Sequence, residues 1–216
     1  MNRDTLKQMA VVSLFWGALW GIAEATVGYL AHLVLILPGI AGFIMFPIGF
    51  YFMTRAYKAT GKPGVLFGTA AVAATIKLAD FFLPAISPLK TLNPALCILM
   101  EAAVVIAVIK ISRLNPAGFR WSQALAISAG WRLGYLFYTT VLFAFALSSE
   151  FVLMGLGHIF RFIVVESLVN ALVITIYVQS AKAFTGEKKQ AFRIRPVYGF
   201  AAVAAALLVK LIPAIV

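Results

Sequence analysis

The chain has 216 residues, of which 63% are hydrophobic and 12% are charged, and its mean hydropathy is +1.00. Soluble domains average about 25% charged residues, so this composition excludes an ordinary soluble domain and indicates a protein embedded in lipid. The formal net charge of +11 comes from bases that lie between apolar runs, which argues against a nucleic-acid-binding domain. The single cysteine, Cys97, excludes an intrachain disulfide and a cysteine-based zinc site.

Seven apolar runs follow one another along the chain, separated by Pro, Gly or polar residues. A spanning helix needs about 20 apolar residues, and the runs lack the period-2 alternation of barrel strands. The predicted fold is therefore all-α, a single transmembrane domain over 1–216 that forms a polytopic bundle of six or seven helices. The run that contains Pro47 is short and the last run is Ala-rich, so the number of spans depends on these two. The predicted spans are about 9–37, 40–54, 64–83, 92–109, 121–147, 151–181 and 197–216.

The basic residues are distributed unequally between the two ends of these spans. With seven spans, Lys90 and Lys210 fall on one side, and 13 bases fall on the other. Short loops rich in Lys and Arg stay in the cytoplasm. We therefore predict a multi-pass cell-membrane protein whose N-terminus is cytoplasmic and whose C-terminus is outside. The 13 bases are Arg3, Lys7, Arg55, Lys58, Lys62, Lys110, Arg113, Arg120, Lys182, Lys188, Lys189, Arg193 and Arg195.

Several charged residues lie inside the predicted spans, in a layer from the membrane midplane toward the outer face. A charge at the bilayer centre costs about 2.5–3.5 kcal/mol on insertion scales, so these side chains must point inward. They either form ion pairs that hold helices together or bind a ligand. Lys77 and Asp80, three residues apart on one helix face, are expected to pair. The set comprises Glu24, Lys77, Asp80, Glu101, Arg132, Arg161 and Glu166, with His158 nearby.

Four acids face three fixed bases, and a charged His158 could make the sum neutral; after Lys77 pairs with Asp80, three glutamates remain against Arg132 and Arg161. A surplus acid could hold a proton, a metal ion or a substrate amine, and an Arg fork could hold a carboxylate or phosphate. The fifth span adds Trp131, Tyr135 and Tyr138 on one stripe, which either stacks on a planar ligand or fills the core. The predicted substrate-binding residues are Glu24, Asp80, Glu101, Trp131, Arg132, Tyr135, His158, Arg161 and Glu166.

Three glycines and one acid share a face of the first span. Gly17, Gly21, Glu24 and Gly28 are separated by four, three and four residues. Because glycine lets another helix approach closely, this face is predicted to pack against a helix of this chain or of a partner. Glu24 would then be buried in a protein contact.

Motifs of enzymatic chemistry are missing from the sequence. There is no Gly-x-Ser-x-Gly elbow, no P-loop and no His-Glu-x-x-His pair. We therefore expect neither an enzyme nor a bound cofactor or metal, and any ATP that drives transport would be bound by another chain.

The sequence resembles the substrate-binding S components of energy-coupling factor (ECF) vitamin transporters over about residues 9–181. The likeness lies in size, apolarity, the basic cytoplasmic side, the small residues of the first span and a polar layer toward the outside. The stretch from Gly64-Val65-Leu66-Phe67-Gly68 to Lys77-Leu78-Ala79-Asp80 is similar to their glycine-rich third region, which ends in an acid. Family members usually have six spans and carry Ala-x-x-x-Ala in the first, where this chain has Gly17-x-x-x-Gly21.

The resemblance implies a protein that captures a small micronutrient at the outer side of the lipid bilayer. It also implies a transmembrane coupling subunit and two ATPase subunits as partners. The acids inside the spans leave a second hypothesis open, a proton- or ion-coupled secondary carrier that works alone. A structural membrane subunit or an intramembrane enzyme is a more remote alternative.

Overall fold

The computed structural model describes residues 2–34, 39–82, 88–111, 120–145, 147, 150–183 and 194–215. Side chains are described for 2–31, 39–82, 88–111, 120–145, 147, 151–180 and 194–210. The predicted loop bases Arg113, Lys188, Lys189 and Arg193 lie outside the described residues. Within the described residues the chain is helical and contains no strand, which confirms the predicted all-α fold.

The first helical stretch comprises α1 (Arg3–Ala23), a π-helical segment (Glu24–Gly28) and α2 (Tyr29–Val34). It is followed by α3 (Ile40–Thr60), α4 (Gly64–Leu78) with a 3-10 turn (Ala79–Phe82), α5 (Pro88–Ile111) and α6 (Trp121–Ala144). After the short α7 (Glu150–Leu153), one helical stretch comprises α8 (Leu156–Phe160), a second π-helical segment (Arg161–Val165) and α9 (Glu166–Ala183). The last helix is α10 (Pro196–Ile215).

Two predicted spans differ from the helices in the structure. The predicted span 40–54 continues to Thr60, because α3 passes through Pro47 and is capped by Gly61. Gly61 has a φ of 66°, a left-handed conformation that suits glycine, and its N–H donates to the carbonyl of Tyr57. The predicted span 151–181 is not one helix, since Gly155 has a φ of 85° and separates α7 from α8.

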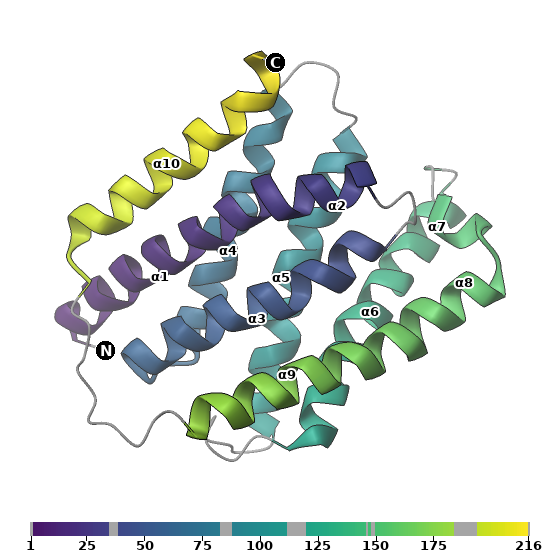
Figure 1. Cartoon of the computed structure of the whole chain (residues 1–216), viewed down its shortest axis with the longest axis horizontal. Coiled ribbons are helices and arrows are strands. Elements are labelled where there is room, and N and C mark those ends of the chain that lie inside the picture. Colours follow the sequence, from purple (N-terminus) through teal and green to yellow (C-terminus); the bar gives the residue numbers. More distant parts are fainter. Residues whose placement is uncertain are drawn as a thin grey trace.

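The helices form two layers (Figure 1). In the nearer layer, α10, α1, α3 and α9 lie side by side in that order, and each contacts its neighbour. The farther layer contains α4, α5 and α6, also in contact in that order. Contacts of α1 with α4, of α3 with α4 and α5, and of α6 with α9 join the layers. A continuous core lies between them, to which the fully buried Trp20, Phe46, Leu66, Ile127 and Trp131 contribute.

Five helical stretches among the described residues are long and apolar enough to cross a membrane: Arg3–Ala31, Ile40–Thr60, Gly64–Phe82, Pro88–Ile111 and Leu156–Ser180. Helix α6 has 24 residues, but Arg132 and its hydroxyl-bearing residues lower its mean hydropathy, and α10 adds a shorter apolar stretch, Pro196–Lys210. Large apolar side chains face outward over the bundle, among them Phe67, Phe137 and Leu172. Such a surface suits lipid rather than water, so the chain is an integral membrane protein.

Candidate functional site: a buried charge network between the layers

Three helices bring Glu101, Arg132 and Glu166 into the interior between the two layers. Glu101 lies on the inward stripe of α5, Arg132 on that of α6, and Glu166 begins α9. Their exposed fractions are 3%, 0% and 4%. A buried charge is costly unless it is paired and hydrogen-bonded, so the partners of these groups decide what the site can do.

The guanidinium of Arg132 is held by the backbone and by aromatic rings. Its Nη1 donates to the carbonyl of Ser128 at 2.8 Å, one turn earlier on α6. Its Cζ lies 4.6 Å from the ring centroid of Trp131 and 5.4 Å from that of Phe162. These cation–π contacts orient the planar group and partly replace its lost hydration.

Glu166 lies between two arginines but makes only loose contacts with them. Its Oε2 is 3.8 Å from Nη2 of Arg132, and its Oε1 is 3.4 Å from Nε of Arg161. Charge-assisted N–H···O bonds are normally about 2.7–2.9 Å long. Nη2 of Arg161 also lies 3.4 Å from Nδ1 of His158, so His158 joins this cluster at its outer end.

A second cluster surrounds Asp80. Lys77 contacts Asp80 Oδ2 at 2.8 Å, which confirms the pairing that their spacing predicts. Lys210 of α10 donates to the other oxygen, Oδ1. The sequence analysis counted Lys210 only among the bases at one side of the spans, so its role as a second partner of Asp80 was missed.

Lys210 changes the balance of charge that the sequence suggested. Counting it, four acids (Asp80, Glu24, Glu101 and Glu166) face four bases (Lys77, Lys210, Arg132 and Arg161) within the described helices. The predicted surplus of acid is therefore wrong. It came from leaving out a base that is distant in sequence, and Lys210 reaches the cluster only because α10 packs along α1.

The bases are shared unevenly among the acids. Two lysines converge on Asp80 and two arginines on Glu166. Glu24 and Glu101, which are 8% and 3% exposed, have no basic nitrogen within 4.0 Å in the described part of the chain. They interact electrostatically with each other, Glu24 also with Lys77 and Lys210, and Glu101 also with Arg132. Two acids thus lie between two clusters that each carry one net positive charge.

Many polar atoms near Arg132 and Glu166 are buried without a hydrogen-bond partner among the described residues. Buried polar groups in proteins are nearly always satisfied, and each exception calls for water, an ion or a ligand. Ser167 and Asn170 were missed by the sequence analysis, although they follow Glu166 on the inward face of α9 and could have been found from that spacing. The unpartnered atoms include Glu101 Oε2, Arg132 Nε and Nη2, both Glu166 oxygens, Ser128 Oγ, Trp131 Nε1, Ser167 Oγ and Asn170 Nδ2.

Each of the two π-helical segments begins at a charged residue of the network. Glu24 is the first residue of the segment Glu24–Gly28, and Arg161 is the first residue of Arg161–Val165. A π-bulge inserts an extra residue into a helical turn and occurs often at functional sites. In this chain each bulge interrupts a helix of the nearer layer next to a buried charge.

The aromatic stripe of α6 mainly packs the core. Trp131 contacts the rings of Phe46 and Phe162 at centroid distances of 5.5 and 5.7 Å. Tyr135 contacts Phe162 at 5.9 Å and Tyr138 at 6.1 Å. The stripe therefore forms an aromatic wall beside Arg132, whose rings pack against one another.

The glycine face of the first span packs against α4. A Cβ added to Gly17 would lie 2.5 Å from the backbone oxygen of Thr69, and one added to Gly21 would lie 2.8 Å from Ile76 Cδ1. A Cβ on Gly28 would lie 3.0 Å from Oε2 of Glu24. The predicted close packing at Gly17 and Gly21 is therefore made within this chain.

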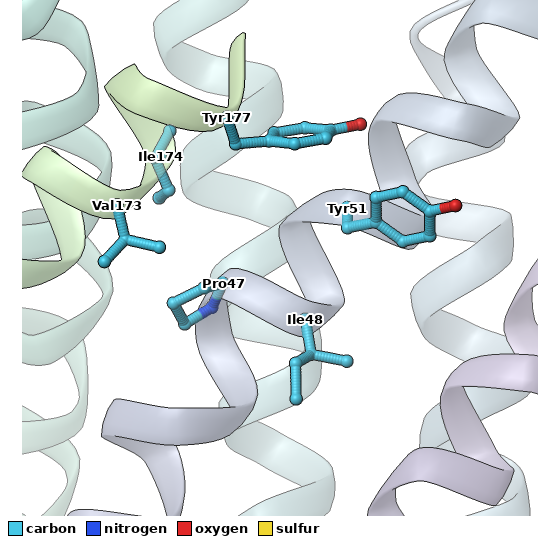
Figure 2. A pocket seen from close by; sticks show the side chains of 6 residues that line it. All are labelled: Pro47, Ile48, Tyr51, Val173, Ile174 and Tyr177. Carbon is cyan, nitrogen blue, oxygen red and sulfur yellow. The ribbon is translucent and has the colours of Figure 1, made fainter. Parts of the chain in front are cut away.

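A separate hollow of about 250 Å³ lies between α3 and α9 (Figure 2). Pro47, Ile48 and Tyr51 line it from α3, and Val173, Ile174 and Tyr177 line it from α9. The two tyrosine rings lie together with a centroid distance of 5.6 Å, and Figure 2 shows their hydroxyl groups pointing the same way. Its lining is apolar and belongs to the outward surface, so it suits an acyl chain better than a polar solute.

The chain is thus a polytopic α-helical membrane protein with a buried network of charges between its two layers. Comparison with known protein families, with curated proteins and with solved structures found no match. Its function must therefore be argued from this network.

Proposed function

We propose that the chain binds a small polar solute inside the membrane and serves its transport as the substrate-binding S component of an ECF-type importer. One observation carries the proposal: Glu101, Arg132 and Glu166 are almost completely buried, yet polar atoms of all three lack hydrogen-bond partners in the described structure. Leaving such an atom unsatisfied costs about 1–3 kcal/mol, and more for a charged group. A bound solute that supplies the missing partners would recover this free energy.

Three features support the S-component form of the proposal. The chain is small, it lacks an ATP-binding motif, and its charged layer extends from the predicted membrane midplane toward the predicted outer face, where an importer captures its substrate. In this form, two ATPases and a coupling subunit complete the transporter. Because α4 covers Gly17 and Gly21, the coupling subunit would dock on another face of the bundle.

Native mass spectrometry of the purified protein tests the proposal. We expect a small molecule to remain bound to the wild-type chain and to be lost from Arg132→Gln. Lys90→Gln, a change at an exposed residue outside the network, is the matched control and should retain the molecule. If the wild type and both variants carry no solute, and solutes offered from a cell extract do not bind, the network is purely structural and the proposal is wrong.

A secondary carrier is the second candidate, and the pair Glu24 and Glu101 favours it. Both carboxylates are buried without a basic nitrogen within 4.0 Å among the described residues, and such acids commonly relay protons or ions in carriers. Liposomes that contain only this chain distinguish the two. Accumulation of the bound solute under an imposed proton or sodium gradient supports the carrier. Binding without transport, converted to ATP-driven uptake by the coupling module, supports the S component.

A further inference from the structure

The Nε–Nη2 edge of Arg132 presents donors that match a carboxylate. The planar guanidinium donates hydrogen bonds along its edges, and its Nη1 already donates to the carbonyl of Ser128. Nε and Nη2, which form the opposite edge, are buried and make no hydrogen bond to any described residue. Two parallel N–H donors at one edge match the two oxygens of a carboxylate, the strongest pairing that an arginine makes.

Glu166 does not occupy this edge. Its nearest oxygen is 3.8 Å from Nη2 of Arg132, which is beyond hydrogen-bond distance. Glu166 also has Arg161 at 3.4 Å, so it keeps a counter-charge when another carboxylate binds to Arg132. A ligand carboxylate can therefore enter without leaving Glu166 unpaired.

Glu101 is the second group of the site, in electrostatic range of Arg132. Its Oε2 is buried and accepts no hydrogen bond from the described residues, and its carboxylate interacts electrostatically with Arg132. An ionised carboxylate only accepts hydrogen bonds, so its missing partner is an N–H or O–H donor. Glu24, a second acid in electrostatic range, favours a donor that carries positive charge.

The net charge of the network sets a further condition on the ligand. The Asp80 and Glu166 clusters each carry one positive charge, and Glu24 and Glu101 together add two negative charges when both are ionised. With all its groups ionised, the network is thus neutral. Adding a net charge to a buried site costs much free energy, whereas a ligand with one positive and one negative group keeps the balance.

We infer that the ligand is a small zwitterion, a molecule of the amino-carboxylic acid class, with its carboxylate on the Nε–Nη2 edge of Arg132 and its ammonium group on Glu101. The inference rests on the proposed function and names the substrate class of the same site. Trp131 and Phe162 contact the guanidinium through their rings and hold its edge in position for the ligand.

Cys97 supplies a probe for this site in the wild-type chain. It is the only cysteine and lies one helical turn before Glu101, in electrostatic range of Glu24, Glu101 and Arg132. Because Cys97 is only partly exposed, a small thiol reagent such as methyl methanethiosulfonate, applied at alkaline pH, should modify it slowly, and a ligand on Arg132 and Glu101 should slow that modification further. Intact-protein mass spectrometry measures the rate on the full chain in detergent.

The test uses a panel of probes in matched sets: the common α-amino acids, β-alanine and γ-aminobutyrate, each beside the carboxylic acid without the amine and the amine without the carboxylate. We expect at least one zwitterion to protect Cys97 and to raise the melting temperature, and its two single-charge analogues to bind at least about tenfold more weakly. Glu101→Gln should remove the preference for the amine, and Arg132→Gln the preference for the carboxylate. Lys90→Gln should keep both preferences.

The outcomes separate this inference from the proposed function. If native mass spectrometry finds a neutral or singly charged solute that is lost from Arg132→Gln, the proposed function stands and the zwitterion is wrong. If no zwitterion of the panel protects Cys97 or raises the melting temperature, the inference is overturned. If neither native mass spectrometry nor the panel finds any ligand, both are overturned.

Discussion

Lys210 on the last helix donates a hydrogen bond to Asp80, which lies 130 residues earlier at the end of α4. Asp80 is also paired with Lys77 on its own helix, so one carboxylate holds two ammonium groups. Lys210 and Asp80 are 6% and 5% exposed, which places their contact inside the protein. This ion pair fastens α10, whose other contacts are mainly with α1, to the rest of the bundle.

The Asp80 cluster predicts unequal effects for its members. Asp80→Asn leaves the buried ammonium group of Lys210 and the partly exposed one of Lys77 without a carboxylate and should cost about 3–5 kcal/mol. Lys210→Met should cost clearly less, because Lys77 still pairs with Asp80, and the double variant should recover part of the loss of Asp80→Asn. Apparent melting temperatures in detergent measure these effects, with exposed Lys90→Met as the control. A Lys210→Met variant as unstable as Asp80→Asn would contradict the sharing of Asp80.

The glycine face predicts a stability loss that needs no partner protein. In Gly17→Ala the new Cβ would lie 2.5 Å from the backbone oxygen of Thr69, so α1 and α4 must separate. Such overpacking typically costs about 1–3 kcal/mol. Gly157→Ala is the matched control, because its Cβ would meet nothing within 4 Å. Equal melting temperatures of the two purified variants would contradict the close packing of α4 against Gly17.

Glu101 and Glu166 should respond oppositely to neutralisation. Glu101→Gln replaces a buried carboxyl group that has no close base among the described residues, so the ligand-free protein should gain roughly 1–3 kcal/mol of stability. Glu166→Gln removes the acid between Arg132 and Arg161 and should lose about 3–5 kcal/mol. Melting curves of ligand-free protein compare the two. A loss of stability in Glu101→Gln would mean that Glu101 serves structure rather than binding.

The distribution of bases predicts the orientation in the membrane. In a Cys97→Ala background, we expect an impermeant maleimide to label Lys90→Cys in intact cells and to leave Lys62→Cys unlabelled. Lys62 precedes the first residue of α4, and Lys90 lies in the first turn of α5, beyond the other end of α4. Both positions are exposed in the structure, so accessibility alone does not separate them. Permeabilised cells, in which both should react, provide the control. The reverse labelling pattern would invert the predicted topology.

The membrane character and the helical fold were predictable from the sequence, because long apolar runs can satisfy their backbone in lipid only as helices or as a closed barrel. The pairing of Lys77 with Asp80 was also predictable, since residues three apart on a helix share a face. The close packing at Gly17 and Gly21 was predictable as a property of that face, although the helix that fills it was not.

The contacts between charges that are distant in sequence were not predictable and depend on how the helices pack. Lys210 reaches Asp80 because α10 runs along α1, and Glu166 meets Arg132 because α9 packs on α6. These contacts depend on the order of helices in the two layers, which local periodicity does not encode. The same arrangement brings two lysines to Asp80 and two arginines to Glu166, and among the described residues it leaves Glu24 and Glu101 without a close base and Nε and Nη2 of Arg132 without a hydrogen bond.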